Sequence, residues 1–140
     1  MNVKRFLLAG IAGFVVMFVL GALWHALLMK GFYATHYGEV QREAENIPVI
    51  ALGMLVLGLL MAYAYPIGYR GGSPVAEGAR FGALVGLILA LVGGIIYYGA
   101  FKITLTGTAV DAVWHVIEQG VGGLVIGLIY GSGTSIEAEA

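Results

Sequence analysis

The chain has 140 residues, of which 60% are hydrophobic and only 11% are charged. About a quarter of the residues of a soluble globular domain are charged, so this composition excludes that class and indicates a membrane protein. The net charge of −1 offers no basic surface to a nucleic acid. The absence of cysteine excludes disulfides, thiolate metal sites and thiol catalysis.

Four apolar blocks approach or exceed the length of about 20 residues that crosses the hydrocarbon core of a bilayer. They run approximately over residues 6–29, 48–65, 81–101 and 109–130. Lys4 and Arg5 precede the first block as they would a signal peptide, but the block is too long and lacks a small-residue cleavage site. We therefore expect an all-α integral membrane four-helix bundle over residues 1–131, followed by a disordered acidic tail over residues 132–140.

Polar residues and prolines predict where the helices begin and end. Asn46, followed by Pro48, is typical of a capped start for the second helix, and Pro66 lies just beyond its expected end. Ser73 is a candidate cap for the third helix. Thr108, with an acid three residues later, resembles a capping box and predicts the start of the fourth.

The first loop, residues 31–47, predicts a short amphipathic helix that lies in the outer membrane interface. Tyr33, His36, Tyr37 and Val40 follow the spacing of one helical face, and the opposite face is charged.

An even number of spans places both termini on one side of the membrane. Four cations would then share that side (Lys4, Arg5, Arg70 and Arg80) and three would lie on the other (Lys30, Arg42 and Lys102). Because cytoplasmic loops carry the excess of Lys and Arg, we expect both termini in the cytoplasm.

Glycine recurs every four residues in the third and fourth helices, and small residues at this spacing let two helix backbones approach closely. The two series are Gly78, Gly82 and Gly86, and Gly123, Gly127 and Gly131. Stepping back by four from Gly123 reaches Gln119, His115 and Asp111. We therefore expect these polar residues to lie on the same face as the packing glycines, toward the interior.

Ionisable residues inside a membrane helix cost about 2.5 to 3.5 kcal/mol each, so they mark candidate functional positions. The dipeptide Trp-His occurs twice, and the second copy lies among acids in the fourth helix. The candidate ligand-binding residues are Trp24, His25, Tyr97, Asp111, Trp114, His115, Glu118 and Gln119.

Several interpretations of these residues remain open. Imidazole and carboxylate groups suit a metal ion, and two histidines suit a haem; neither has a specific motif here. Asp111 is also explained as a helix cap, and the tryptophans as interface residues. Glu118 is explained equally well as a neutral carboxyl bonded to a neighbour and as a proton or cation site. No nucleophile–base motif, phosphate loop or zinc-protease motif is present, so we expect no enzymatic activity.

Short motifs follow one another in an order that resembles a known family. They are Leu23-Trp24, Phe32-Tyr33, Tyr37-Gly38 and Val110-Asp111-Ala112-Val113-Trp114. They resemble small four-helix bacterial membrane proteins classed as domain of unknown function 2177 and, more loosely, 1761. The resemblance implies an inner-membrane fold and no assigned activity. Gly21 stands where that family has an aspartate, so Asp111 and the two tryptophans are the motif residues that carry over.

The sequence thus favours a small polytopic membrane protein whose polar pocket binds or passes a small ligand, a proton or a cation. The alternative is a non-catalytic accessory subunit of a larger membrane complex, docked through its glycine faces. Four short helices enclose little space, so we also expect a homo-oligomer or a complex.

Overall fold

The computed structural model describes residues 2–131, and every regular element in that range is helical. The elements are α1 (Val3–Ala22), the π-helical segment η1 (Leu23–Leu28), α2 (Lys30–Tyr37), α3 (Ile47–Gly68), α4 (Pro74–Ile88), the π-helical segment η2 (Leu89–Gly93), α5 (Gly94–Ala100) and α6 (Leu105–Tyr130). Across these residues, four helices are long and apolar enough to cross a membrane: Val3–Leu28, Ile47–Gly68, Pro74–Ala100 and Leu105–Tyr130. The all-α class and the four long apolar helices are therefore confirmed. The predicted tail lies outside the described residues.

Two of the predicted helix caps are confirmed. The Asn46 side chain accepts a hydrogen bond from the Val49 N–H at 3.3 Å, and the Ser73 hydroxyl accepts one from the Ala76 N–H at 3.3 Å. The predicted end of the second helix is wrong, because α3 continues through Pro66 to Gly68.

Both the third and the fourth helix begin before their apolar blocks; the Ser73 cap predicts the start of the third helix correctly, and the predicted start of the fourth at Thr108 is wrong. α4 begins at Pro74 rather than at residue 81, because Glu77 and Arg80 pair with each other at 2.6 Å within one face of its first turns. α6 begins at Leu105, and its cap is Thr104, whose hydroxyl accepts a hydrogen bond from the Gly107 N–H at 3.0 Å. Thr108 therefore lies inside the helix.

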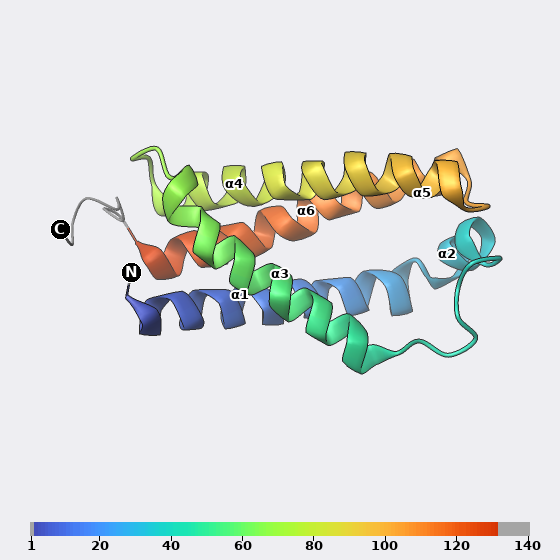
Figure 1. The fold of residues 1–140 in the computed structure, drawn as a ribbon, viewed down its shortest axis with the longest axis horizontal. Coiled ribbons are helices and arrows are strands. Elements are labelled where there is room, and N and C mark those ends of the chain that lie inside the picture. Colours follow the sequence, from blue (N-terminus) through green and yellow to red (C-terminus); the bar gives the residue numbers. More distant parts are fainter. Residues whose placement is uncertain (1, 132–140) are drawn as a thin grey trace.

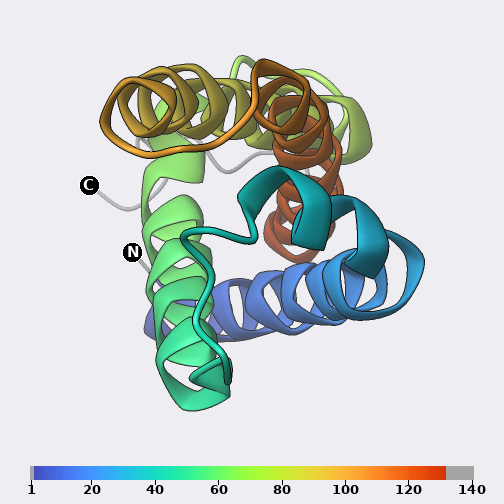
Figure 2. The ribbon, with the colours of Figure 1, turned by 90° about the vertical axis from the view of Figure 1, so that its right-hand side faces the viewer.

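The long helices run alternately in opposite directions, and the ends of the described chain lie at the same end of the molecule (Figure 1). A guanidinium nitrogen of Arg5 donates a hydrogen bond at 3.2 Å to the carbonyl oxygen of Tyr130, which joins the start of α1 to the end of α6. The short helix α2 lies at the opposite end of the molecule (Figure 2), where His36 contacts Thr104 at the start of α6.

α4 and α6 approach each other through their glycines, as the sequence predicts. A Cβ added to Gly78 would overlap the carbonyl oxygen of Gly123, and one added to Gly82 would overlap that of Gln119. A Cβ at Gly127 would overlap the carbonyl of Pro74. Only residues without a side chain permit this contact between backbones. Gly131, the last of the predicted series, ends α6 and takes no part in the contact.

α1 and α6 pack by alternating small and large residues. Along the interface, Gly13 faces Ile126, Met17 faces Gly122, and Gly21 faces Glu118. Each glycine on one helix leaves space for a larger side chain of the other. This alternation sets the register that brings the η1 end of the first long helix beside the first half of α6.

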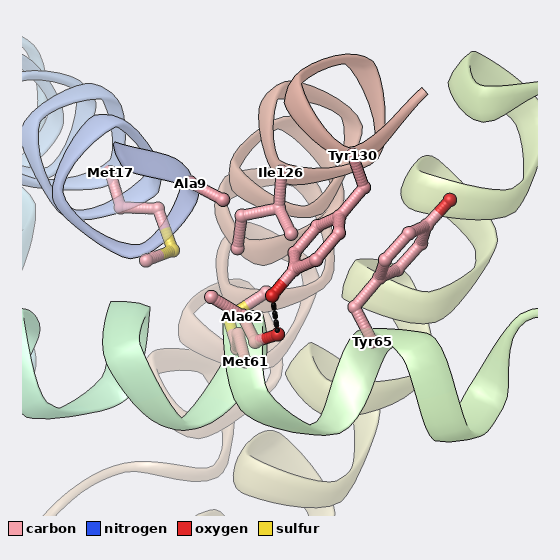
Figure 3. Packing of buried hydrophobic residues seen from close by; sticks show 7 residues of the cluster. All are labelled: Ala9, Met17, Met61, Ala62, Tyr65, Ile126 and Tyr130. Atoms are coloured by element: carbon pink, nitrogen blue, oxygen red, sulfur yellow. Dashed lines mark hydrogen bonds between the residues drawn. The ribbon is translucent and has the colours of Figure 1, made fainter. Parts of the chain in front are cut away.

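The apolar core lies at the end of the molecule that holds the two ends of the described chain, away from α2. Its buried residues come from α1, α3 and α6, and they are Ala9, Met17, Met61, Ala62, Tyr65, Ile126 and Tyr130 (Figure 3). The Tyr130 hydroxyl donates a hydrogen bond at 2.8 Å to the carbonyl oxygen of Ala62. The other end of the molecule is instead held by polar and aromatic contacts around α2.

Candidate functional site

The two Trp-His pairs meet through their tryptophans. The Trp24 and Trp114 rings are parallel, with an interplanar angle of 0° and centroids 4.3 Å apart. Trp114 is buried and Trp24 is half-buried. An aromatic pair of this kind contributes about 0.5 to 1.5 kcal/mol beyond its buried area. The interpretation of both tryptophans as separate interface residues does not fit this arrangement.

The π-helical segment η1 carries Trp24 and His25. A π segment inserts an extra residue into a helical turn and occurs often at functional sites. The His25 ring packs on the Tyr33 ring at 4.4 Å, and His25 lies close enough to Asp111 and His115 for their charges to interact. The segment thus turns both side chains of the first Trp-His pair toward α6 and α2.

Tyr33 on α2 connects the first long helix to α6. The Trp24 indole N–H donates a hydrogen bond at 3.1 Å to the Tyr33 oxygen, and the Tyr33 hydroxyl donates one at 2.8 Å to the Asp111 carboxylate. Burial is the main cause that raises the pKa of the Tyr33 hydroxyl, so the phenol stays neutral and keeps its proton for this donation. Burial also raises the pKa of Tyr37 to about 12, and the charge of Asp111 adds to the effect.

A second contact holds α2 against the start of α6. The His36 imidazole is hydrogen-bonded to the Thr104 hydroxyl at 2.5 Å, and the Thr104 N–H donates to the His36 carbonyl at 3.3 Å. Gly107 makes room for this contact, because a Cβ there would lie 2.9 Å from the His36 Cβ. α2 is therefore shorter than predicted, excludes Val40, and has its aromatic face turned onto α6.

Glu118 and Gln119 lie about midway along α6 and are almost fully buried, with 4% and 1% of their surfaces exposed. The Gln119 amide donates a hydrogen bond at 2.8 Å to one oxygen of the Glu118 carboxyl. The other oxygen faces Gly21, where an added Cβ would lie only 2.7 Å away. Gly21 therefore leaves the space that this carboxyl occupies.

Buried polar atoms without a hydrogen-bond partner gather on α6 next to this carboxyl. Within residues 2–131 there are five such side-chain atoms: Tyr65 Oη, Arg80 Nε, Trp114 Nε1, His115 Nδ1 and Gln119 Oε1. The last three fall within residues 114–119, and the Trp114 indole lies beside the Glu118 carboxyl. Each unmade bond costs about 1 to 3 kcal/mol. A concentration of this kind points to a binding position rather than to a structural contact.

Most of the predicted site residues come together, and two predictions about them are wrong. Asp111 is not a helix cap, since α6 starts six residues before it. Tyr97 does not join the site: it is 57% exposed, and its ring packs on Phe101. Five of the remaining candidates lie where η1 and α2 meet α6: Trp24, His25, Asp111, Trp114 and His115. Glu118 and Gln119 lie further along α6, where Glu118 faces Gly21 of α1 and the Gln119 backbone faces Gly82 of α4.

The sequence interpretation missed Tyr33 as a site residue. The helical spacing of Tyr33, His36 and Tyr37 contained the signal, because it places three aromatic or imidazole rings on one face. The sequence predicts that this face lies in the membrane interface, whereas the structure turns Tyr33 toward Asp111.

The side chains do not gather as a metal site would. In the part of the chain that the structure describes, no three His, Asp or Glu residues are close enough to hold one metal ion. The donors of Glu118 and Gln119 are one carboxyl and one amide.

A cavity of about 310 Å³ lies beside the tryptophan pair. Its lining is apolar: Trp24, Ala109, Val110, Val113, Trp114 and Ile117. Val113 and Ile117 are exposed, so the cavity opens on the outer face of α6, and Glu118 does not line it. This cavity is separate from the polar positions.

No family model, curated protein or solved structure matches the chain. The resemblance to the families of unknown function therefore stays a prediction that rests on its short motifs.

Proposed function

We propose that the protein is a non-enzymatic multi-pass protein of the bacterial inner membrane that binds and releases a proton at Glu118. The observation that carries the proposal is a buried carboxyl that accepts a hydrogen bond from the Gln119 amide and lies beside the Trp114 indole, in the same stretch of α6 as the buried His115 Nδ1 and Gln119 Oε1, which lack partners. A carboxyl removed from water is more stable protonated, and its proton can leave when a polar path opens.

The surface of the molecule supports insertion into a bilayer. Large apolar side chains point outward on all four long helices, for example Leu27 at 71%, Ile67 at 66% and Ile95 at 67% exposure. Water-soluble proteins rarely expose contiguous apolar surface of this extent. The four helices would span the membrane as a bundle whose polar positions lie between α1, η1 and α6.

The order of the polar residues along α6 favours a proton that reaches Glu118 from the end of the molecule that carries α2. From that end toward the middle of α6, Asp111, His115 and Glu118 follow one another on one helical face, one turn apart. Beyond Glu118 the α1–α6 contact becomes apolar, first at Met17 and Gly122 and then at Ile126. This arrangement favours a site that is loaded from one side over a pathway through the whole chain.

The donor set favours a proton over a metal ion. A hard cation prefers six or more oxygen ligands, whereas Glu118 and Gln119 together supply two free oxygens at most. A proton needs only the carboxyl itself and a neighbour to stabilise it. A small cation would compete at the same two oxygen atoms.

The proposal is tested by following the carboxyl directly. Infrared difference spectra of the protein in lipid should contain the C=O band of a protonated, buried carboxylic acid that changes with pH. Glu118→Gln should abolish this band, and proton uptake on a pH step should fall by one proton per chain. Glu77→Gln serves as control, because Glu77 is already paired with Arg80 at the other end. An unchanged band in Glu118→Gln would refute the proposal.

The structure weakens the argument for the alternative, an accessory subunit docked through its glycine faces. The glycines of α4 and α6 that were expected to bind a partner are used inside the chain, where their Cα atoms contact neighbouring backbone. Substituting Gly82 or Gly127 would therefore disturb the fold itself, so loss of a partner in such a variant would not identify a docking surface.

A further inference from the structure

We propose that α2 is a lid over the Glu118 site and that the Tyr33 hydroxyl is its latch. This inference rests on the proposed function, because it names how access to the same site is controlled. Figure 2 shows α2 across the end of α6, where the polar face that leads to Glu118 begins.

The lid is weakly embedded compared with the long helices. Tyr33 is the only residue of α2 that is buried. Met29 separates α2 from η1 with φ −116° and ψ 13°, so the lid does not continue the first long helix. On its other side, residues 38–46 contain no helix and are exposed. A segment with few buried apolar contacts opens at a lower free energy than the core.

Polar contacts keep the lid closed, and they converge on one side chain. The Tyr33 oxygen accepts from Trp24 and its hydroxyl donates to Asp111, so one phenol bridges the two walls of the entrance. The His36–Thr104 contact fastens the other end of α2. Just beyond the end of α2, Glu39 forms an ion pair with Lys102 at 3.3 Å that is exposed and contributes little.

Opening would expose the face that leads inward. When Tyr33 leaves, Asp111 loses its donor and Trp24 loses its acceptor, and both groups become available to water. Water could then reach His115 and Glu118 along the same helical face. With α2 closed, Tyr33 occupies the hydrogen bonds that entering water would make.

The chain contains no cysteine, so a pair of introduced cysteines can lock the lid selectively. His36 and Thr104 contact each other by both side chain and backbone, which makes them suitable partners. In His36→Cys/Thr104→Cys, oxidation should hold α2 closed and reduction should free it. Tyr33→Phe should favour the open lid, and Tyr98→Phe, an exposed tyrosine of α5, is the matched control.

Two measurements are made on these variants. The first is hydrogen–deuterium exchange of the Glu118 carboxyl, read from the shift of its infrared band in D2O. The second is quenching of tryptophan fluorescence by acrylamide, which reports on α2 because the chain has only two tryptophans and both lie near it.

Oxidation should slow exchange and reduce quenching relative to the same protein after reduction. Tyr33→Phe removes the hydrogen bonds of Tyr33 with Trp24 and Asp111 and should accelerate exchange by about five- to a hundredfold, the factor that two hydrogen bonds contribute to an equilibrium. If the disulfide forms but the oxidised and reduced proteins are quenched equally, the proposal that α2 acts as a lid is refuted. If quenching responds to the lock but no band disappears in Glu118→Gln, the lid stands and the proposed proton site fails.

Discussion

At the scale of single residues, the absence of a side chain at Gly21 leaves the space in which the Glu118 carboxyl lies. With any side chain at position 21, the Glu118 carboxyl would lose the space beside α1, because a Cβ would stand 2.7 Å from its oxygen. The space that a side chain at position 21 would fill is therefore occupied by the Glu118 carboxyl.

This dependence gives the first prediction. Gly21→Ala should destabilise the protein by about 0.5 to 1.5 kcal/mol, the contribution of one hydrogen bond, because the end of the Glu118 side chain must move away from the new methyl group and from Gln119. In the Glu118→Ala background the same substitution should cost much less, since the space is then free. Thermal unfolding in detergent of the two single variants and the double variant measures the coupling. Additive losses would mean that the two residues do not touch.

The tryptophan stack is the second feature that can be tested residue by residue. Two parallel indoles 4.3 Å apart should stabilise the protein by about 0.5 to 1.5 kcal/mol beyond their buried area. The double variant Trp24→Ala/Trp114→Ala should therefore lose less stability than the sum of the two single variants, by about that amount, in thermal unfolding in one detergent. Additive losses would show that the rings act independently.

The sequence identified the chemistry of the site better than its geometry. Hydrophobic blocks and the repeated Trp-His located the polar residues of η1 and α6, since buried ionisable groups stand out against an apolar background. The spacing of Tyr33, His36 and Tyr37 places their rings on one face of α2, but it does not say which way that face turns, so the contact of Tyr33 with Asp111 could not be predicted. The same limit explains Tyr97, which the sequence placed in the site and the structure leaves exposed.

At the scale of elements, hydropathy located the helices and misjudged their ends. An apolar block ends at the first charged residue. A helix can continue past that residue when its backbone hydrogen bonds are made and its charged side chains are paired. Glu77 and Arg80 pair with each other within α4 and therefore allow it to begin seven residues before its apolar block. The π segments η1 and η2 were not foreseen, because no local residue pattern requires the extra residue in either turn.

The glycine contact between α4 and α6 supplies the third prediction. Gly82→Ala should destabilise the protein by more than about 2 kcal/mol, because the new methyl group meets the backbone carbonyl of Gln119, which cannot move aside. Gly53→Ala is the matched control: its position in α3 has nothing within 4 Å, and alanine there should be neutral or stabilise by about 0.5 to 1 kcal/mol. Unfolding temperatures in one detergent compare the pair. Equal shifts of the unfolding temperature in the two variants would contradict the close contact between the backbones of α4 and α6.

At the scale of the whole molecule, the two ends are built differently. The end that holds the chain termini has the apolar core and the Tyr130–Ala62 hydrogen bond. The α2 end has stacked tryptophan rings, a tyrosine that bridges Trp24 and Asp111, and the buried, partnerless Nδ1 of His115. A stable core at one end can hold the long helices in register while the other end opens and closes. The proposed proton site and its lid both depend on this asymmetry.

The orientation of these two ends in the membrane is the final prediction. Both termini should face the cytoplasm, with α2 on the outside, because the terminal end carries the larger number of cations. Single cysteines introduced at exposed positions test this: Ala76→Cys near the start of α4 and Gln41→Cys in the loop after α2. A membrane-impermeant thiol reagent added to intact spheroplasts should label Gln41→Cys and leave Ala76→Cys unlabelled until the membrane is disrupted. The reverse pattern would place the lid in the cytoplasm, so that the site would take its proton from inside the cell.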